Sequence, residues 1–226
     1  MASTTVQRAF IFDMDGTIVD NMDFHTKSWI TFFERRGHVL DADAFFRDTA
    51  GRQGHEIMRS YIGEHLQDDE IALLNGEKEE LYRELYRPHL ATVAGFDALI
   101  AAARSEGVKL AVATAAPPEN IVFTLDGLDL RRRFDAIAGA GDVARGKPNP
   151  DVFLLAAERC GVAPADCIVF EDAPLGVEAA RRAGMRAVVL TTTLPAEAFA
   201  EFDNVIAVVS DYTGLSADAL FALSAR

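Results

Sequence analysis

The sequence predicts an α/β protein in which an open parallel sheet is interrupted by a small all-helical insert. Three observations favour this fold class. Short runs of branched apolar residues recur along the chain, amphipathic stretches lie between them, and one long region contains helical patterns alone. The chain has 226 residues, half of them hydrophobic, so it is long enough to bury a sizeable core.

Five apolar runs have the length of strands that are buried on both faces. They cover residues 9–12, 110–113, 168–170, 187–190 and 205–209. Runs of this kind that alternate with helices are typical of a parallel sheet covered by helices on both sides. We therefore expect an open, Rossmann-like sheet.

Three amphipathic stretches between these runs end at a glycine, where helices commonly terminate. The predicted helices cover residues 100–105 before Gly107, 150–159 before Gly161, and 174–182 before Gly184. Each predicted helix lies between two predicted strands along the chain, as the alternating pattern requires.

Residues 21–90 break this alternation, because they contain helical patterns and no convincing strand. Helices are predicted over residues 23–36, 54–66 and 69–87, the first stopped by Gly37 and the last by Pro88. Two apolar stripes are expected to form the insert's own core: Phe24, Ile30 and Phe33, and Leu73, Leu81 and Leu85. The domains are therefore expected to be an α/β core of residues 1–20 and 91–226 and a helical insert of residues 21–90.

The charge balance limits the possible partners. The chain has 22 lysine and arginine residues against 35 aspartate and glutamate residues, a formal net charge of −13, and no basic run. Nucleic-acid binding depends on clustered basic residues, so we expect no nucleic-acid partner. An anionic substrate would need a bound cation or a few well-placed basic groups.

The expected location is the cytoplasm. No apolar stretch approaches the roughly 20 residues that span a bilayer, and the N-terminal residues do not resemble a signal peptide. Cys160 and Cys167 form no CxxC pair, which fits a reducing compartment. We expect a monomer without a membrane partner.

Polar residues follow three of the predicted strands, at the edge where open parallel sheets bind their ligands. They are Asp13 and Asp15 in DMDGT, Thr114 after LAVA, and the pair Glu171 and Asp172. Four carboxylates brought together would repel one another, which raises the pKa of one of them or requires a cation. Mg²⁺ suits such a site, because it prefers carboxylates, waters and a substrate phosphate.

These residues have the chemistry of phosphoryl transfer. Beside a metal ion and Lys147, Asp13 can attack phosphorus as a covalent nucleophile. Asp15 can protonate the leaving oxygen and later take a proton from water. Backbone N–H groups, hydroxyls and an ammonium would bind the phosphate, and the residues expected to supply them are Gly16, Thr17, Thr114, Ala115 and Lys147.

The four motifs DMDGT, Thr114 after LAVA, Lys147 in GKPNPD and Glu171-Asp172 in VFEDAPLGVEAARRAG resemble the haloacid dehalogenase superfamily. They occur in the family's order, and the pattern is most similar to the β-phosphoglucomutase-like phosphatases. The resemblance implies Mg²⁺, an aspartyl-phosphate intermediate at Asp13 and acid/base catalysis by Asp15. It also implies that residues 21–90 are a cap domain, and that the metal ligands are Asp13, the Asp15 carbonyl and Asp172, with Glu171 assisting.

The resemblance further indicates two substrate-binding residues in the cap. His25 follows Asp15 by ten residues, as does a histidine that the mutase subgroup places between cap and core. Arg52, in AGRQGH, is similar to the arginine with which the mutase cap holds a second phosphate. It follows Gly51 directly, however, whereas the mutase arginine stands three positions after its glycine.

Three hypotheses follow. The first is a Mg²⁺-dependent phosphatase of a small phosphorylated metabolite such as a sugar phosphate, with the cap excluding bulk water and selecting the leaving group. The second is a mutase that transfers phosphate between sugar hydroxyls. Pro117 and Pro118 replace a lysine and an asparagine of the mutases, and Thr17 is more typical of phosphatases. The third, a phosphoryl-switch receiver domain, would be about half this length and would order its motifs differently.

Overall fold

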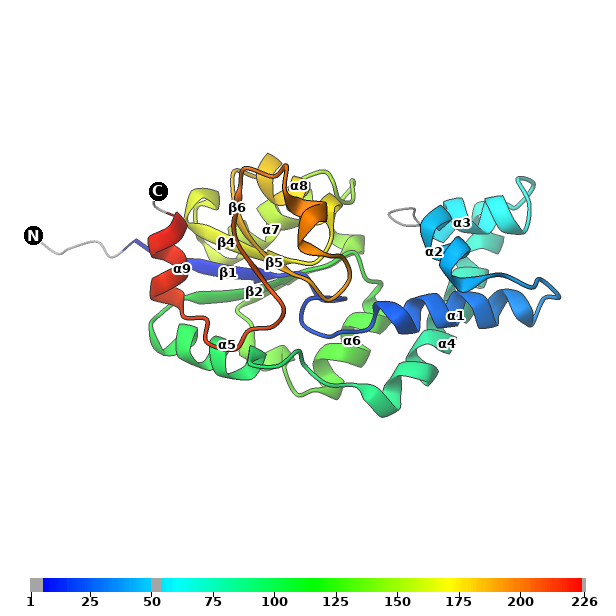
Figure 1. Ribbon diagram of the computed structural model, residues 1–226, viewed down its shortest axis with the longest axis horizontal. Helices are drawn as coiled ribbons and strands as arrows, with labels where there is room; N and C mark the ends of the chain where they lie inside the picture. Colours follow the sequence, from blue (N-terminus) through cyan, green and yellow to red (C-terminus); the bar gives the residue numbers. More distant parts are fainter. Residues whose placement is uncertain (1–5, 50–53, 225–226) are drawn as a thin grey trace, which may run out of the picture. The chain divides into compact units, whose positions relative to one another are not determined.

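The computed structural model describes residues 6–49 and 54–224, and the chain divides into two compact units (Figure 1). One unit is Asn21–Leu90, which is helical, and the other is Met1–Asp20 together with Ala91–Arg226, which contains the sheet. Arg52, expected to bind substrate, lies outside the described residues.

Six parallel strands form a single sheet in the order β3-β2-β1-β4-β5-β6, so the predicted open parallel sheet is confirmed. The strands are β1 (Ala9–Phe12), β2 (Lys109–Ala113), β3 (Ala136–Ala138), β4 (Cys167–Glu171), β5 (Arg186–Leu190) and β6 (Val205–Val209). The chain winds outward from β1 to β3 and then returns to β4 on the other side of β1. In open α/β sheets, ligands bind where the strand order reverses in this way.

Helices cover both faces of the sheet (Figure 1). On one face, α7 (Asp151–Cys160) and α8 (Pro174–Arg182) pack with Ala9 and Ile11 of β1 in one buried apolar cluster. On the other face, Phe12 contacts Phe96 of α5 (Phe96–Ser105), and Phe10 stacks on Phe221 of α9 (Ala217–Ser224). The β1 side chains therefore alternate between two cores, as a strand buried on both faces requires.

Several elements differ from the predicted ones. β3, α9 and α6 (Pro118–Gly127) were not predicted, whereas α8 has the predicted bounds. Short 3₁₀ turns occupy Arg87–His89, Arg131–Arg133, Ala140–Asp142, Pro164–Asp166 and Ala196–Phe199. Among the described helices, none is long and apolar enough to cross a membrane.

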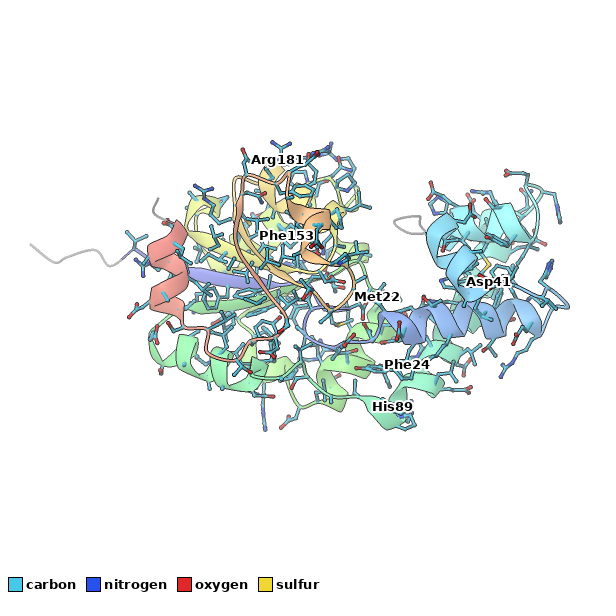
Figure 2. All side chains as sticks on the ribbon, in the orientation of Figure 1. Met22, Phe24, Asp41, His89, Phe153 and Arg181 are labelled. Carbon is cyan, nitrogen blue, oxygen red and sulfur yellow. The ribbon has the colours of Figure 1, made fainter. Side chains whose placement is uncertain are left out.

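The helical unit consists of α1 (Met22–Glu34), α2 (Ala42–Thr49), α3 (Gly54–Tyr61) and α4 (Asp68–Tyr86). Of the predicted core stripes, Phe33 and Leu81 are buried, but Leu73 is 71% exposed, so its assignment to the core was wrong. Phe24 is half-buried and packs 4.9 Å from the rings of Tyr86 and His89 (Figure 2).

One further prediction for this unit needs correction, and one helix was not predicted. The predicted helix over residues 54–66 ends at Tyr61, because Gly63 adopts a positive φ of 155° and the chain turns there. α2 was not predicted at all.

Candidate active site

The pairing of β1 with β4 places Asp13 beside Glu171. Phe12 is in register with Phe170, and the backbone N–H of Asp13 donates to the Phe170 carbonyl at 3.0 Å. The rings of Phe12 and Phe170 stack with their centroids 4.5 Å apart, and this contact stabilises the pairing of the two strands next to the carboxylates. Because the two parallel strands end at the same level, their carboxylates emerge together.

Lys147 joins the ends of three strands. Its Nζ donates to Asp13 Oδ1 and to Glu171 Oε1, both at 2.6 Å, and to the carbonyl of Ala113 at 3.3 Å. The ammonium also lies 4.7 Å from the centroid of the buried Phe153 ring (Figure 2). The Lys147 and Asp13 side chains are only 10% and 11% exposed, so this ion pair is largely shielded from water.

Asp172 lies beside this pair and receives hydrogen bonds from two hydroxyls. Thr17 Oγ1 donates to Oδ1 at 3.3 Å, and Thr193 Oγ1 donates to Oδ2. Gly16 approaches the same carboxylate so closely that a Cβ there would overlap Asp172 Oδ2. Its φ of 75° is a second reason why this position requires glycine.

The two residues that lead into α8 hold Glu171. The backbone N–H groups of Asp172 and Ala173 donate to Glu171 Oε2 at 3.0 and 3.1 Å. A Cβ at Gly176 would overlap the same carboxylate, so the helix can pack against Glu171 only with glycine there. One Glu171 oxygen therefore binds backbone and the other binds Lys147.

Asp13, Glu171 and Asp172 can supply a metal site. One oxygen from each carboxylate lies within 4.8 Å of the other two, and all three residues are buried. Among the residues that the structure describes, Lys147 is the one whose ammonium pairs with these carboxylates, at Asp13 and Glu171. The donor set fits a hard cation, because such ions prefer carboxylate oxygens and would relieve the remaining repulsion.

The pKa values reflect this excess of negative charge. Burial raises the pKa of Asp13 well above its usual value, although Lys147 acts in the opposite direction. Burial and the charge of Glu171 raise the pKa of Asp172 to about 7, despite the hydrogen bonds from Thr193 and Thr17. Burial alone would lower the pKa of Lys147, but the charges of Asp13 and Glu171 outweigh it and raise this pKa, so the lysine stays protonated.

Other predicted phosphate-binding residues border the same strand ends. Thr114 directly follows β2, is 1% exposed, and accepts a hydrogen bond from the Ala116 N–H at 3.0 Å. Ala115 is exposed, and Asp15 is half-buried in the turn after β1. The Thr17 hydroxyl donates to Asp172 and its side chain is fully buried; its expected role in phosphate binding stays a prediction.

His25 belongs to the helical unit. Its Nδ1 lies 3.0 Å from Nζ of the buried Lys78, and its ring stacks on Tyr82 with the centroids 3.8 Å apart. Lys78 also contacts Glu79 at 2.9 Å. The sequence did not indicate this buried lysine, because an isolated lysine is usually at the surface.

Sequence reasoning also missed the residues that hold the turn after β1. Thr192 Oγ1 donates to the carbonyl of Gly16, and the Tyr212 hydroxyl donates to the carbonyl of Thr17 at 3.0 Å. Thr193 binds Asp172, as described above. Thr192 and Thr193 lie just beyond the end of β5, so their position at a strand end is the signal in the sequence that marks them.

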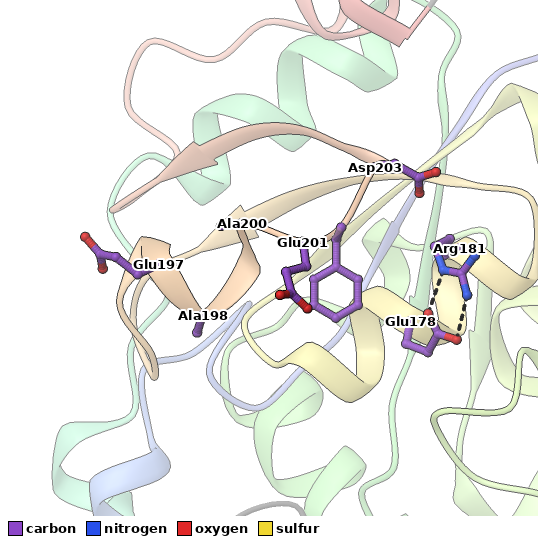
Figure 3. A pocket seen from close by; sticks show the side chains of 8 residues that line it. Glu178, Arg181, Glu197, Ala198, Ala200, Glu201 and Asp203 are labelled. Atoms are coloured by element: carbon purple, nitrogen blue, oxygen red, sulfur yellow. Dashed lines mark hydrogen bonds and ion pairs between the residues drawn. The ribbon is translucent and has the colours of Figure 1, made fainter.

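An open surface pocket beside α8 is a different feature (Figure 3). Arg181 donates to Glu178 at 2.7 and 2.9 Å there, and Glu197, Glu201 and Asp203 also line it. Four carboxylates against one paired arginine would repel a phosphate. The lining residues do not include the predicted site residues, so we do not assign substrate binding to this pocket.

The sequence matches the haloacid dehalogenase-like hydrolase family over residues 7–184. This span contains the strand-end carboxylates, Thr114 and Lys147 described above. The chain therefore belongs to the haloacid dehalogenase-like hydrolases, and the membership that its motifs predict is confirmed.

Similar proteins act on phosphate esters, according to their names. The chain is 35% identical over 201 residues to validoxylamine A 7'-phosphate phosphatase of Streptomyces hygroscopicus subsp. limoneus, covering 85% of this chain and 90% of that protein. It is 37% identical over 178 residues to fructose-1-phosphate phosphatase of Escherichia coli, covering 79% and 93%. A crystal structure of β-phosphoglucomutase from Clostridium difficile has a TM-score of 0.82 at 25% identity and covers 97% of this chain and 98% of that chain.

Proposed function

We propose that this hydrolase is a Mg²⁺-dependent phosphatase of a small phosphorylated metabolite, with a sugar phosphate as the preferred class. The observation that carries the proposal is the buried bridge of Lys147 to Asp13 and Glu171, next to Asp172. The similarity to a fructose-1-phosphate phosphatase and to a second phosphatase supports the substrate class. We propose that the protein acts in the cytoplasm as a monomer.

In the proposed first step, an Asp13 carboxylate oxygen attacks phosphorus. The new P–O bond forms as the bond to the leaving oxygen breaks, and Asp15 donates a proton to that oxygen. Lys147 holds Asp13 in place and offsets negative charge on the nucleophile and on the transferred group. The product of this step is an aspartyl phosphate at Asp13.

In the second step, water attacks the same phosphorus and Asp15 takes its proton. The bond to Asp13 then breaks, and inorganic phosphate leaves. N–H groups of the turn at Gly16 and of the segment at Thr114 and Ala115, together with the Thr17 and Thr114 hydroxyls, are proposed to bind the phosphate oxygens. The same groups serve both steps because charge develops on the same oxygens.

A bound Mg²⁺ would offset negative charge on the phosphate and on the carboxylate cluster. Its proposed ligands are Asp13, the Asp15 carbonyl and Asp172, with Glu171 assisting. The fit rests on the donor set, which is three buried carboxylates with oxygens within 4.8 Å of one another.

The proposed cap is the helical unit, residues 21–90, and the proposed catalytic core is residues 1–20 with 91–226. In such a division the cap excludes bulk water and selects the leaving group. His25 and Arg52 are its proposed substrate-binding residues.

A panel of phosphate esters tests this function. We expect Mg²⁺-dependent release of inorganic phosphate from one or more sugar phosphates, measured together with the organic product. Loss of turnover in EDTA and its return with Mg²⁺ would support the proposed Mg²⁺ dependence. Failure to release phosphate from any sugar phosphate tested would contradict the proposed substrate class.

The same panel separates a second candidate, a phosphosugar mutase. The similarity to a β-phosphoglucomutase structure over 97% of the chain favours this alternative. A mutase would convert glucose 1-phosphate to glucose 6-phosphate faster than it releases phosphate. Product analysis by NMR distinguishes the two outcomes directly.

Gly16 provides a structural prediction. In the variant Gly16→Ala, the added Cβ would displace Asp172, so we expect kcat to fall by about 100-fold. The matched control is Gly107→Ala, because Gly107 has a similar φ of 81° but nothing within 4 Å of an added Cβ. Both variants carry the backbone strain, but only Gly16→Ala disturbs the carboxylate. Equal loss of kcat in the two variants would contradict the assigned role.

The pKa of Asp172 predicts how Mg²⁺ stabilisation depends on pH. In EDTA, Asp172 binds more protons in the folded chain than in the unfolded chain between the usual pKa of 3.8 and the folded value of about 7. The contribution of Asp172 to the free energy of unfolding therefore falls as pH rises through this window. Mg²⁺ binds the ionised carboxylate, so it should raise Tm strongly near about pH 8 and little near about pH 5. Thermal unfolding at both pH values, at matched ionic strength, measures this. An equal increase of Tm by Mg²⁺ at the two pH values would refute this prediction.

A further inference from the structure

Three consecutive threonines follow β5, and each has a different partner. The backbone N–H of Thr191 donates to the carbonyl of Val209 at 2.9 Å, which continues the pairing with β6. Thr192 Oγ1 donates to the carbonyl of Gly16. Thr193 Oγ1 donates to Asp172 Oδ2. The segment therefore contacts β6, the turn after β1 and the end of β4.

This segment reaches across the sheet edge. β4 lies between β5 and β1 in the strand order, so Thr192 must cross the end of β4 to reach Gly16. Tyr212, which follows β6, reaches the same turn through its hydrogen bond to Thr17. Two segments from the outer strands thus hold the turn that carries Asp13 and Asp15.

The Asp172 carboxylate is oriented from both sides. Thr17 donates to one oxygen and Thr193 to the other, and the close approach of Gly16 limits rotation. Asp172 is 3% exposed, so water cannot readily replace a lost donor. Groups that orient metal ligands in this way commonly control metal affinity.

We propose that Thr193 is a positioning residue for metal binding, whose hydroxyl holds Asp172 in the orientation that binds a divalent cation. This inference rests on the proposed function, because it takes the cluster of Asp13, Glu171 and Asp172 as the Mg²⁺ site. It assigns Thr193 a role distinct from that of Thr192, which binds backbone rather than a metal ligand.

The test is Mg²⁺ binding by calorimetry without substrate. Thr193→Val keeps the side-chain shape but removes the donor, and we expect its Kd for Mg²⁺ to rise about 10- to 100-fold. Thr193→Ser retains the hydroxyl and should restore an affinity close to that of the wild type. Thr191→Val is the matched control, since its hydroxyl makes only a 3.4 Å contact with the Val209 carbonyl and its backbone hydrogen bond remains.

Activity supplies a second readout that a general structural defect would not reproduce. For Thr193→Val, the Mg²⁺ concentration giving half-maximal turnover should rise by the same factor as Kd, while kcat at saturating Mg²⁺ stays near that of the wild type. If the valine variant does not fold, Thr193→Ala measures the same loss of the hydroxyl.

Two results would overturn the inference. Wild-type Mg²⁺ affinity in both Thr193→Val and Thr193→Ala would show that the hydroxyl does not position Asp172, while leaving the proposed phosphatase intact. Absence of Mg²⁺ binding to the wild type would contradict the proposed function itself, and the role of Thr193 with it.

Discussion

Replacing Asp13 with asparagine is expected to lower kcat by at least about 10⁴-fold, because the amide cannot act as the nucleophile. The fold should survive this change. Burial raises the pKa of Asp13, so its charge is unfavourable in the folded chain, and Lys147 keeps its partner Glu171. Turnover of the best sugar phosphate at saturating Mg²⁺, with thermal unfolding in parallel, measures both effects.

Asp126→Asn is the control for this substitution. Asp126 is an exposed residue of α6 that pairs with Arg131, and its loss should leave kcat unchanged. The proposed nucleophile would be wrong if Asp13→Asn kept more than about 1% of wild-type kcat, which corresponds to an increase of under about 3 kcal/mol in the activation free energy.

Replacing Lys147 with methionine is expected to damage both stability and activity. The variant leaves the carboxylates of Asp13 and Glu171 buried without their cation. Breaking a buried pair in this way costs about 3–5 kcal/mol of unfolding free energy near neutral pH. We expect kcat to fall by about 10³-fold, since charge on the transferred group loses its fixed partner.

The destabilisation of Lys147→Met should depend on pH with a definite sign. Burial already raises the pKa of Asp13, and without the lysine this pKa should rise further, so the folded variant holds a proton on Asp13 that the unfolded chain releases. The deficit relative to the wild type should therefore be largest at alkaline pH and shrink towards about pH 4. Urea unfolding across this range measures it, and a deficit independent of pH would contradict the electrostatic explanation.

Lys109→Met is the matched control, because Lys109 also forms an ion pair at 2.9 Å, with Asp135. Its side chain is 40% exposed, so water screens the charges. We expect a cost below about 1 kcal/mol and no change in kcat. The contrast between two lysine ion pairs isolates the effect of burial.

Much of the fold could be predicted because apolar runs of strand length are distinctive. The runs at Ala9–Phe12 and Val205–Val209 have the predicted bounds. β3 escaped prediction because Ala136–Ala138 is short and rich in alanine, which has little preference for strands. α6 contains the β-branched residues Ile121, Val122 and Thr124, which lower helix propensity, yet burial of one helix face overrides that preference.

The strand-end rule identified Asp13, Glu171 and Asp172, and the parallel register brings them together. Thr193 was not predictable in the same way. A carboxylate at a buried strand end has few structural explanations, whereas threonine is common at such positions for structural reasons alone. That Thr193 binds Asp172 depends on how the segment after β5 crosses the end of β4, which the sequence does not show. The catalytic roles of these residues remain predictions that the variants above address.

The central claim is that Asp13 carries the phosphoryl group during turnover, and trapping that species tests it most directly. The wild type would be mixed with a sugar phosphate that it hydrolyses and that carries the radiolabel in its phosphate group. The reaction would be quenched in acid within one turnover, and the protein digested and mapped by mass spectrometry. The mechanism predicts hydroxylamine-labile label on the peptide containing Asp13, and none in Asp13→Asn. Label on a different residue, or full turnover with no labelled enzyme at any quench time, would contradict it.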